Sequence, residues 1–441
     1  MSVKKALSLG ILLLITASVL SRDGKYASEA VRAVSLDRST AQTTAQNTEM
    51  PSPQPNGNMD SSSTPAANST ELTQIVSSQS KFGINLFKEI VSQNPQSNTF
   101  ISPLSVGVAL SMLYNGTDGE TQKELSSLLE IMDLGMAEVN QGNKLLMQEL
   151  ESSDSEVQIA IANSLWSKQD FSLEQSFLDT NQEYYNAAVE TLDFSNPESV
   201  NIINSWVAEN TENKITNIIE RISPDQALFL INAIYFKGQW QNQFNPEATK
   251  EQFFYTDEGE SKQHPLMFNF GNYKYYENSN FQLVNLPYGS GRLGMNIFLP
   301  KKTSDLTKFM ELLDSEKLTS WVEQMRFKEG KIQFPRFKQE YETSLNDILQ
   351  QLGATTMFDS STADFSALSD DSLAVDTVKH KAVIEVNEEG TEAAAATSIG
   401  AVATSVTIPF NMIVDRPFFY TIQDNETGAI VFMGTIHDPE E

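Results

Sequence analysis

The sequence predicts an α+β fold, because helical patterns dominate its first half and strand patterns its second half. Apolar residues recur near helical spacing from Leu72 to Ile90, whereas residues 228–236 are almost continuously apolar. Short strand-like runs then follow one another toward the end of the chain, and we find no internal repeat. Apolar residues make up 40% of the chain, which is enough for a sizeable core.

Two helices are predicted at the start of the folded part. The first is the amphipathic segment that begins near Leu72. The second begins at Pro103, because Ser102 is a good N-cap and proline suits the first helical position. Residues 106–113 are apolar on nearly every side, which indicates a buried helix, and Gly116 suits its C-terminal end.

The next segments are predicted to be a strand, a helix and a second strand. In residues 157–162, Val157, Ile159 and Ile161 alternate with Gln158, Ala160 and Ala162, which is the pattern of a strand. The apolar residues of 204–219 recur at the spacing of a helix. The apolar run at 228–236 is best explained as a strand that is covered on both faces. Further strands are predicted at residues 283–286, 295–299, 331–334, 382–386 and 430–434.

Residues 289–294 match the pattern Gly-x-Gly-x-x-Gly, which occurs in dinucleotide-binding proteins. That function requires a strand before the glycines and a helix after them. Here residues 295–300 have the pattern of a second strand, so the glycines are predicted to form a hairpin turn. We expect no cofactor.

Composition excludes several classes of function. The chain has 441 residues, a formal net charge of −28 and no cysteine. A surface so acidic repels nucleic acid and anionic membranes, so neither is an expected partner. The absence of cysteine excludes disulfides, zinc–thiolate sites and cysteine nucleophiles. Length alone suggests about three domains, at ~150 residues each.

Nothing in the sequence indicates an enzyme. The only histidines are His264, His380 and His437, and none belongs to an HExxH metal motif. No Gly-x-Ser-x-Gly elbow occurs either. We therefore expect no catalytic residue and no metal site, and His380 is interpreted as a structural histidine.

The N-terminal region is predicted to lie outside the folded domain. Lys4 and Lys5 precede an apolar run at 6–20, which is the pattern of a secretory signal over residues 1–21. An uncleaved N-terminal anchor is the alternative, although the run is short for a membrane span. Residues 22–71 are rich in Ser, Thr, Gln, Asn and Pro and are predicted to be a disordered linker. The expected location is extracellular or periplasmic.

The most informative segment is an acidic, glycine-marked run of small residues. This hinge comprises Glu388, Glu389, Gly390, Thr391, Glu392, Ala393, Ala394, Ala395, Ala396 and Thr397. At strand spacing, one face of the segment from Thr391 to Ala403 is small or apolar throughout. The segment could therefore enter a sheet without burying an unpaired charge. An alanine-rich helix is the alternative interpretation, since alanine has the highest helix propensity.

The hinge resembles that of the inhibitory serpins, the suicide inhibitors of serine and cysteine proteases. Other strings resemble the same family and follow in its order: residues 98–105, 116–121, 232–240, 286–288, 335–337, 364–366, 380–382 and 415–418. The resemblance covers about residues 72 to 438, within a folded domain predicted at 72–441. It implies one large domain with a central, mostly antiparallel main sheet, further β-sheets, several helices and an exposed reactive loop at about 388–409.

The resemblance also implies where a protease would cut. Counting from Gly390 places the scissile bond at Thr404–Ser405, while counting back from Pro417 gives a bond about two residues later. Ala403, Val402 and Val406 are the alternative bait residues. The loop between Gly390 and Thr407 has no Lys, Arg or aromatic residue, so elastase-like or subtilisin-like serine proteases are the expected partners.

Five further residues match family positions that control opening of the main sheet: Ser102, Ser105, Asn232, His380 and Trp240. The first four are expected to form a polar network under the sheet, and Trp240 to lie where insertion begins. The simpler interpretation is that Ser102 is only a helix cap and Asn232 a hydrogen-bonded buried amide.

The function that the resemblance implies is suicide inhibition of serine proteases, with cysteine proteases as a further class of target. The alternative is a non-inhibitory relative that acts as a carrier, a chaperone or a sacrificial substrate. Some family members bind sulfated polysaccharide through a basic helix, but residues 135–155 hold one lysine and several acids. We therefore expect no heparin-like cofactor, and we expect a monomer.

Overall fold

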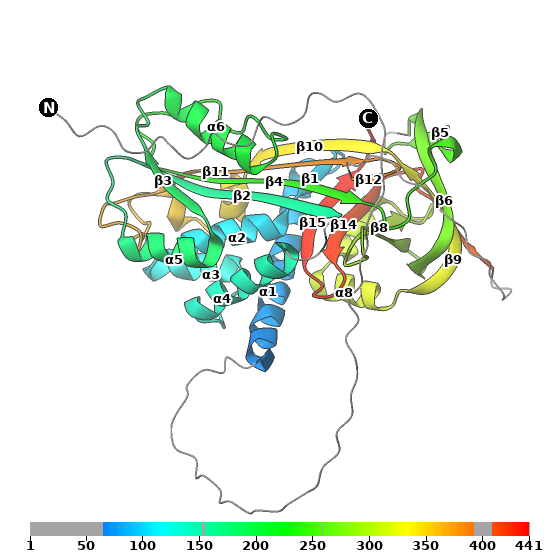
Figure 1. Ribbon diagram of the computed structural model, residues 1–441, viewed down its shortest axis with the longest axis horizontal. Coiled ribbons are helices and arrows are strands. Elements are labelled where there is room, and N and C mark those ends of the chain that lie inside the picture. Colours follow the sequence, from blue (N-terminus) through cyan, green and yellow to red (C-terminus); the bar gives the residue numbers. More distant parts are fainter. Residues whose placement is uncertain (1–64, 152–153, 155, 258, 392–407, 441) are drawn as a thin grey trace, which may run out of the picture. The chain divides into compact units, whose positions relative to one another are not determined.

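The protein has an α+β fold, as predicted. The structure is a computed structural model, and it describes residues 65–151, 154, 156–257, 259–391 and 408–440. All of them belong to one compact unit, Ser62–Glu441. Figure 1 shows the helices packed around two β-sheets. Within the described residues, no helix combines the length and the apolar character needed to cross a membrane.

The first sheet, called the main sheet below, has six strands in the order β10-β11-β12-β4-β2-β3. The strands are β2 (Val157–Lys168), β3 (Ala188–Leu192), β4 (Leu228–Gln239), β10 (Phe337–Ser344), β11 (Val375–Val386) and β12 (Gly390–Thr391). Strands β10 and β11 pair antiparallel, as do β4 and β2. In contrast, the central neighbours β4 and β11 pair in parallel over most of their length. At the edge of the sheet, β2 and β3 also pair in parallel.

The second sheet has nine strands, in the order β1-β15-β14-β8-β7-β6-β9-β13 with β5 paired to β6. These are β1 (Thr99–Ile101), β5 (Lys250–Tyr255), β6 (Ser261–Glu277), β7 (Phe281–Pro287), β8 (Leu293–Pro300), β9 (Arg326–Pro335), β13 (Phe410–Ile413), β14 (Phe418–Asp424) and β15 (Ile430–Ile436). Strands β7 and β8 form an antiparallel hairpin. Gly289 and Gly291 lie in its turn with φ of 46° and 95°, so the predicted hairpin is confirmed.

Helices cover both faces of the main sheet, and others lie beside the second sheet (Figure 1). They are α1 (Pro65–Gln93), α2 (Pro103–Tyr114), α3 (Gly119–Leu128), α4 (Met136–Glu151), α5 (Gln175–Tyr185), α6 (Glu198–Asn210), α7 (Leu306–Leu312), α8 (Ser315–Glu323) and α9 (Asn346–Gln351), with 3-10 turns at Pro246–Ala248 and Thr356–Phe358. Helix α6 lies on one face of the sheet and α2 on the other, inside the main core.

The apolar run of β4 is explained by these two layers. Phe229, Ile231 and Ala233 belong to the cluster under α6, whereas Leu230 and Ile234 belong to the main core beside α2. Successive side chains of a strand point to opposite faces, so both faces of this strand need apolar residues. The prediction of a strand covered on both sides is confirmed.

Two helix boundaries differ from the prediction. Helix α1 begins at Pro65, ahead of the expected start at Leu72, and proline at the first helical position followed by two alanines favours this extension. The helix expected at 204–219 instead ends at Asn210. Asn213 follows with a positive φ of 58°, a conformation that an α-helix cannot contain.

The residues after α6 are buried in an irregular segment. The side-chain oxygen of Asn204 accepts hydrogen bonds from the backbone N–H groups of Ile218 and Ile219, at 2.9 and 3.0 Å. Both isoleucines are buried in the cluster under α6. The apolar spacing that predicted a long helix therefore comes from a helix and a separate segment that pack in the same layer.

Candidate functional site

The described part of the hinge begins with a turn at the end of β11. The backbone N–H of Asn387 donates to the carbonyl oxygen of Gly390 at 2.9 Å. The backbone N–H of Trp240, just beyond β4, donates to the carbonyl oxygen of Glu389 at 2.9 Å. The turn is thus closed on itself and fastened to the end of β4.

After this turn the chain enters the main sheet as β12. Thr391 lies opposite Val386 of β11 and opposite Gly238 of β4, and both pairings are antiparallel. Farther down, β4 and β11 pair directly with each other over residues 228–235 and 375–383. We call this parallel pairing the seam. The hinge therefore occupies the point where the two strands separate, and it runs toward the seam.

Thr391 is already fully buried, with 0% of its surface exposed. Its hydroxyl lies 3.0 Å from the hydroxyl of Tyr288, which is also buried. Burial raises the pKa of Tyr288 well above its ordinary value, so this phenol stays neutral. Thr391 is thus already inside the main sheet in the uncleaved chain, paired with both β11 and β4.

Gly390 is required by the close approach of two backbones. Its φ is +149°, and a Cβ atom added there would lie 2.1 Å from the carbonyl oxygen of Gly238. It would also lie 2.7 Å from the Cα of Gln239. Backbone atoms cannot give way as a flexible side chain does, so only glycine allows β12 to pair with β4 here.

Glu388 holds the turn through a buried carboxylate. Arg336 Nε donates to both carboxylate oxygens at 2.8 Å, and the hydroxyl of Thr249 donates to one of them at 2.5 Å. Burial by itself raises the pKa of Glu388, but the hydrogen bonds from Arg336 and Thr249 outweigh it and lower the pKa overall. The carboxylate is therefore charged at neutral pH, and its ion pair fixes the start of the hinge.

Trp240 lies at the same place, as the sequence predicts. Its ring stacks on Tyr288 with centroids 4.3 Å apart, and its indole N–H donates to the carbonyl oxygen of Asn387 at 2.9 Å. Trp240 thus contacts both the turn and Tyr288, whose hydroxyl lies beside that of Thr391. Trp240 therefore closes the top of the sheet over the hinge.

The four other predicted residues form a network under the seam. The backbone N–H of Ser102 donates to His380 Nε2 at 3.2 Å, and His380 Nδ1 lies 2.5 Å from Asn232 Oδ1. Since Nε2 accepts, the imidazole is neutral and Nδ1 carries the proton. Complete burial lowers the pKa of His380 to about 3, which agrees with this assignment.

Sequence reasoning missed the fifth member of this network, Asn163 of β2. The side-chain amide of Asn232 donates to the Asn163 side-chain oxygen and to the hydroxyl of Ser105. Asn163 and Asn232 are direct neighbours in the β2–β4 register. An asparagine within a strand is the one sequence signal that was available, because buried amides need partners.

The network joins the two strands of the seam. His380 and Asn232 are paired in the parallel register of β11 and β4, and their side chains are hydrogen-bonded to each other. Trp240 is not part of this network, since eight residues of extended chain place it about 26 Å from Asn232. The predicted residues thus form two sites, one at the top of the sheet and one beneath its centre.

The chain on the far side of the reactive loop is held in the other sheet. Ile408, at the start of the described segment, is 85% exposed. Strand β13 then pairs in parallel with β9, and Phe410 stacks on Tyr275 with centroids 4.1 Å apart.

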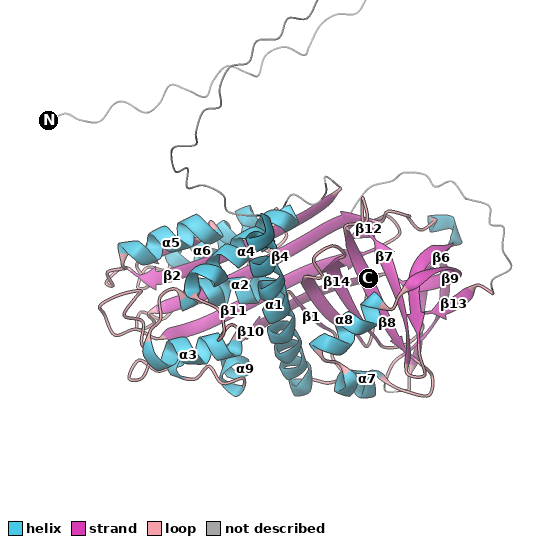
Figure 2. Ribbon diagram, turned by 90° about the horizontal axis from the view of Figure 1, so that it is seen from below, coloured by secondary structure: helices cyan, strands magenta, loops and turns pink. Residues whose placement is uncertain are grey.

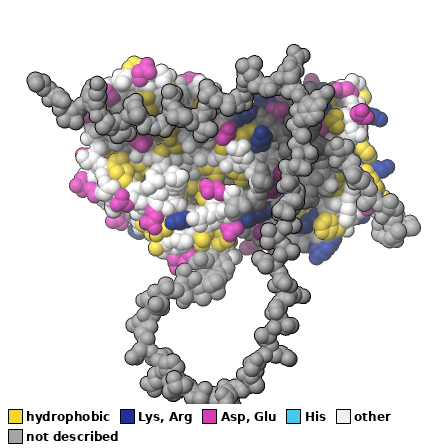
Figure 3. Space-filling view, viewed as in Figure 1, with side chains coloured by type: hydrophobic (Ala, Val, Ile, Leu, Met, Phe, Trp, Pro, Cys, Tyr) yellow, Lys and Arg dark blue, Asp and Glu magenta, His cyan; other side chains and the backbone are white. Residues whose placement is uncertain are grey.

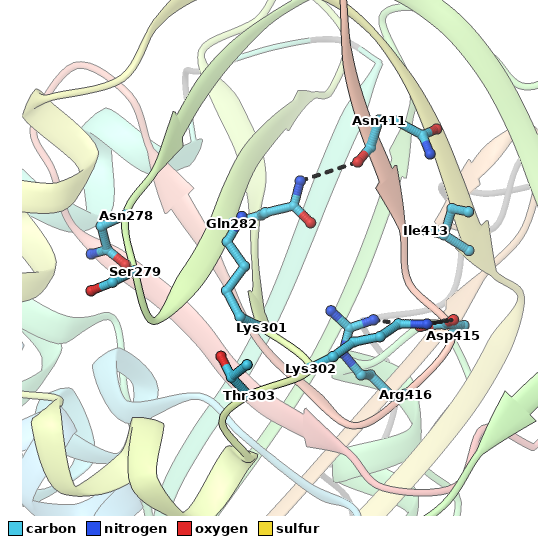
Figure 4. Close-up of a pocket in the computed structure, with 10 residues that line it drawn as sticks. All are labelled: Asn278, Ser279, Gln282, Lys301, Lys302, Thr303, Asn411, Ile413, Asp415 and Arg416. Atoms are coloured by element: carbon cyan, nitrogen blue, oxygen red, sulfur yellow. Dashed lines mark hydrogen bonds and ion pairs between the residues drawn. The ribbon is translucent and has the colours of Figure 1, made fainter.

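Figure 4 shows a polar pocket of about 490 Å³ beside β13. Gln282 reaches across it and donates to the carbonyl oxygen of Asn411 at 3.1 Å. Arg416 donates to the carbonyl oxygen of Pro300 at 3.0 and 2.7 Å, and to Asp415 at 2.5 Å. The two ends of the loop are therefore anchored in different sheets.

The rest of the predicted loop lies outside the described residues. This applies to the hinge residues Glu392, Ala393, Ala394, Ala395, Ala396 and Thr397 and to the predicted scissile bond Thr404–Ser405. It also applies to the predicted signal at 1–21 and to the linker as far as residue 64. These assignments remain predictions.

Comparison with known proteins identifies the family. The model of the family described as "Serpin (serine protease inhibitor)" matches residues 77–439. The chain belongs to the serpin family. It is 35% identical to Serpin B6 of Pongo abelii over 367 residues, which cover 81% of this chain and 97% of that protein. The description of this family is thus that of protease inhibitors rather than of catalysts.

Solved serpin structures share the fold. The native state of the thermophilic serpin tengpin matches with a TM-score of 0.77 and 30% identity, over 82% of this chain and 94% of that one. Human thyroxine-binding globulin, solved with thyroxine, matches with a TM-score of 0.78 and 28% identity. That match covers 84% of this chain and all of the globulin chain (100%).

Proposed function

We propose that this serpin inhibits serine proteases as a suicide substrate. The observation that supports this most directly is β12, which lies between β4 and β11 and pairs antiparallel with both. A strand extended from β12 in the same direction would run between β4 and β11, along the seam. The protease would attack the Thr404–Ser405 bond and form an acyl-enzyme, and the freed hinge would insert before the ester is hydrolysed.

The seam makes such insertion favourable. Strands β4 and β11 pair in parallel, and a strand inserted between them in the orientation of β12 replaces one parallel pairing by two antiparallel ones. Antiparallel pairing is slightly more stable per residue, and the number of backbone hydrogen bonds rises. The small side chains from Ala393 to Thr397 would bury no charge.

The two sites described above would control this step. The bond between His380 and Asn232 crosses the seam and has to break as the strand passes. At the top, Glu388 and Trp240 hold the turn about which the hinge would rotate. Cleavage separates the hinge from β13, which is anchored in the second sheet, so the hinge can move while β13 stays in place.

The bait sequence supports elastase-like or subtilisin-like targets, because small and β-branched residues suit shallow apolar pockets. Cysteine proteases are a further class of target in this proposal. The protein would act as a secreted or periplasmic monomer. No heparin-like cofactor is part of this proposal, because α4 carries a single lysine, Lys144, among several acidic residues. Acidic side chains are scattered over the visible face in Figure 3, and with a net charge of −28 they disfavour nucleic acid.

The test is a titration of pancreatic-type elastase and of subtilisin with the full chain, followed by denaturing gels and mass spectrometry. We expect a band that resists denaturant and contains both proteins, together with a released fragment that begins at Ser405. Cleavage of the loop by these and other small-residue proteases without a covalent complex would contradict inhibition. It would support the rival function of carrier, chaperone or sacrificial substrate.

A further inference from the structure

The outer face of strands β6 and β9 is open to solvent. Figure 2 shows these strands beside β13 at one end of the domain. Their register places Phe270 opposite Lys331 and Lys274 opposite Phe327. Phe327 is 69% exposed and Phe270 47% exposed, whereas Ile332, which points to the opposite face, is buried. Exposed aromatic and basic side chains therefore alternate across the two strands.

This face lies where the reactive loop joins the second sheet. Phe410 of β13 is opposite Gly330 of β9, and the two strands run in parallel. The chain ahead of Phe410 therefore arrives from the end of β9 that carries Phe327. Ile408, which precedes β13, is 85% exposed. Ile408 and Phe327 are the two most exposed large hydrophobic residues in the part of the chain that the structure describes.

The same two strands are basic, although the protein as a whole is acidic. Their basic residues are Lys262, Lys274, Arg326, Lys328 and Lys331, and their acidic residues are Glu277 and Glu329. The whole chain, in contrast, has 30 basic and 58 acidic residues. In Figure 3, Lys and Arg side chains stand at the edge of the molecule where Figure 1 shows β5, β6 and β9. Among the described residues, neither Lys274 nor Lys331 is in an ion pair.

A protease bound at the predicted scissile bond would reach this face. Ser405 precedes Ile408 by three residues, which span at most about 11 Å. A globular protease of about 220 residues has a radius of about 22 Å. Its surface would therefore extend beyond Ile408 and over the end of β9.

We propose that the face formed by Phe270, Lys274, Phe327 and Lys331 is a second contact surface for the target protease, outside the reactive loop. The inference rests on the proposed function, because it takes the partner to be the protease that attacks the loop. The face fits a protease surface with an apolar centre and acidic side chains around it. Aromatic residues anchor interfaces, and complementary charges speed association and select partners.

The test measures the dissociation constant between the full chain and a subtilisin of net negative charge whose catalytic serine is replaced by alanine. Neither cleavage nor trapping occurs with this probe, so docking is measured alone. We expect Phe327→Ser to weaken binding about tenfold, as truncation of an aromatic anchor does. Met132→Ser is the matched control, because Met132 is 68% exposed between α3 and α4, and it should leave binding unchanged.

The charges are tested by a second pair of variants. Lys331→Glu should weaken binding about fivefold at low ionic strength, and the effect should vanish in 1 M NaCl, where the Debye length is about 3 Å. Lys123→Glu is the matched control, since it changes the net charge equally at an exposed position of α3, and it should alter binding less than twofold.

Unchanged dissociation constants in Phe327→Ser and Lys331→Glu, or no binding of the wild type, would overturn the inference. A covalent complex of the full chain with active subtilisin, formed alongside such a result, would leave the proposed inhibition standing. Sedimentation of the full chain tests the other occupant. A dimer that Phe327→Ser dissociates would assign the face to a second copy of the chain and would also overturn the inference.

Discussion

Replacing Thr391 by arginine should convert the inhibitor into a substrate. Thr391 is fully buried, and its hydroxyl lies 3.0 Å from the neutral hydroxyl of Tyr288. The carboxylate of Glu388 is already bound by Arg336 and Thr249. A buried charge without a partner costs about 3–5 kcal/mol. The arginine would therefore leave the sheet and keep β12 out of it.

The size of the effect follows from the competition between insertion and ester hydrolysis. If the insertion step becomes about 3 kcal/mol less favourable, its rate falls more than 100-fold. The number of acyl-enzymes hydrolysed for each protease molecule trapped should then rise by roughly the same factor. The number of inhibitor molecules consumed per protease molecule trapped, which is one plus that ratio, should rise accordingly.

The assay is a titration of residual elastase or subtilisin activity, with denaturing gels to separate complex from cleaved inhibitor. Thr391→Ser is the matched control, because it keeps the hydroxyl and remains small, and its stoichiometry should equal that of the wild type. If Thr391→Arg still traps protease at the wild-type ratio, the hinge does not act as argued here.

Three further predictions follow from the two sites. Gly390→Ala should lower the free energy of unfolding by more than about 1 kcal/mol and impair trapping, whereas Gly353→Ala, also at positive φ but with open space around its Cβ, should leave trapping unchanged. In the folded chain the pKa of His380 is about 3, whereas in the unfolded chain it has its usual value. Lowering the pH should therefore reduce the free energy of unfolding of the wild type more than that of His380→Gln. Urea unfolding between pH 7 and 5 should show a difference of about 1.4 kcal/mol per pH unit below about 6.5, and parallel curves would refute this origin. Arg336→Ala should cost about 3 kcal/mol at pH 7. Because the pKa of Glu388 is lowered in the folded chain, the ion pair stabilises fully above the unfolded pKa of about 4.3, and this stabilisation is lost as the pH falls below that value through the lowered folded pKa. The cost of Arg336→Ala should therefore shrink over that range, and a cost independent of pH would contradict it.

The sequence predicted those parts of the fold whose patterns are local. The apolar run of β4, the cap of α2 at Ser102 and the glycine turn between β7 and β8 all appear where expected. The helix at 204–219 was mispredicted because its end depends on a positive φ at Asn213. The segment after it is held by long-range hydrogen bonds to Asn204, which no periodicity records.

The candidate site could be predicted only in part, because some of its contacts join residues that are far apart in the sequence. Family resemblance named residues on β4, α2 and β11 that the structure brings together under the seam. It did not indicate Asn163, whose role exists only through its pairing with β4, or the contact of Arg336 with Glu388 across 52 positions of the chain. The burial of Thr391 before cleavage was also missed, since it depends on how far β4 and β11 separate at their ends.

The most direct test of the central claim is hydrogen–deuterium exchange of the full chain before and after cleavage at the loop by elastase or subtilisin. If the hinge inserts, peptides from residues 392–403 should become strongly protected in the cleaved protein, and β4 and β11 should remain protected while no longer pairing with each other. Protection confined to Thr391 and the residues before it, with residues 392–403 exchanging as fast after cleavage as before, would contradict insertion and with it the proposed mechanism.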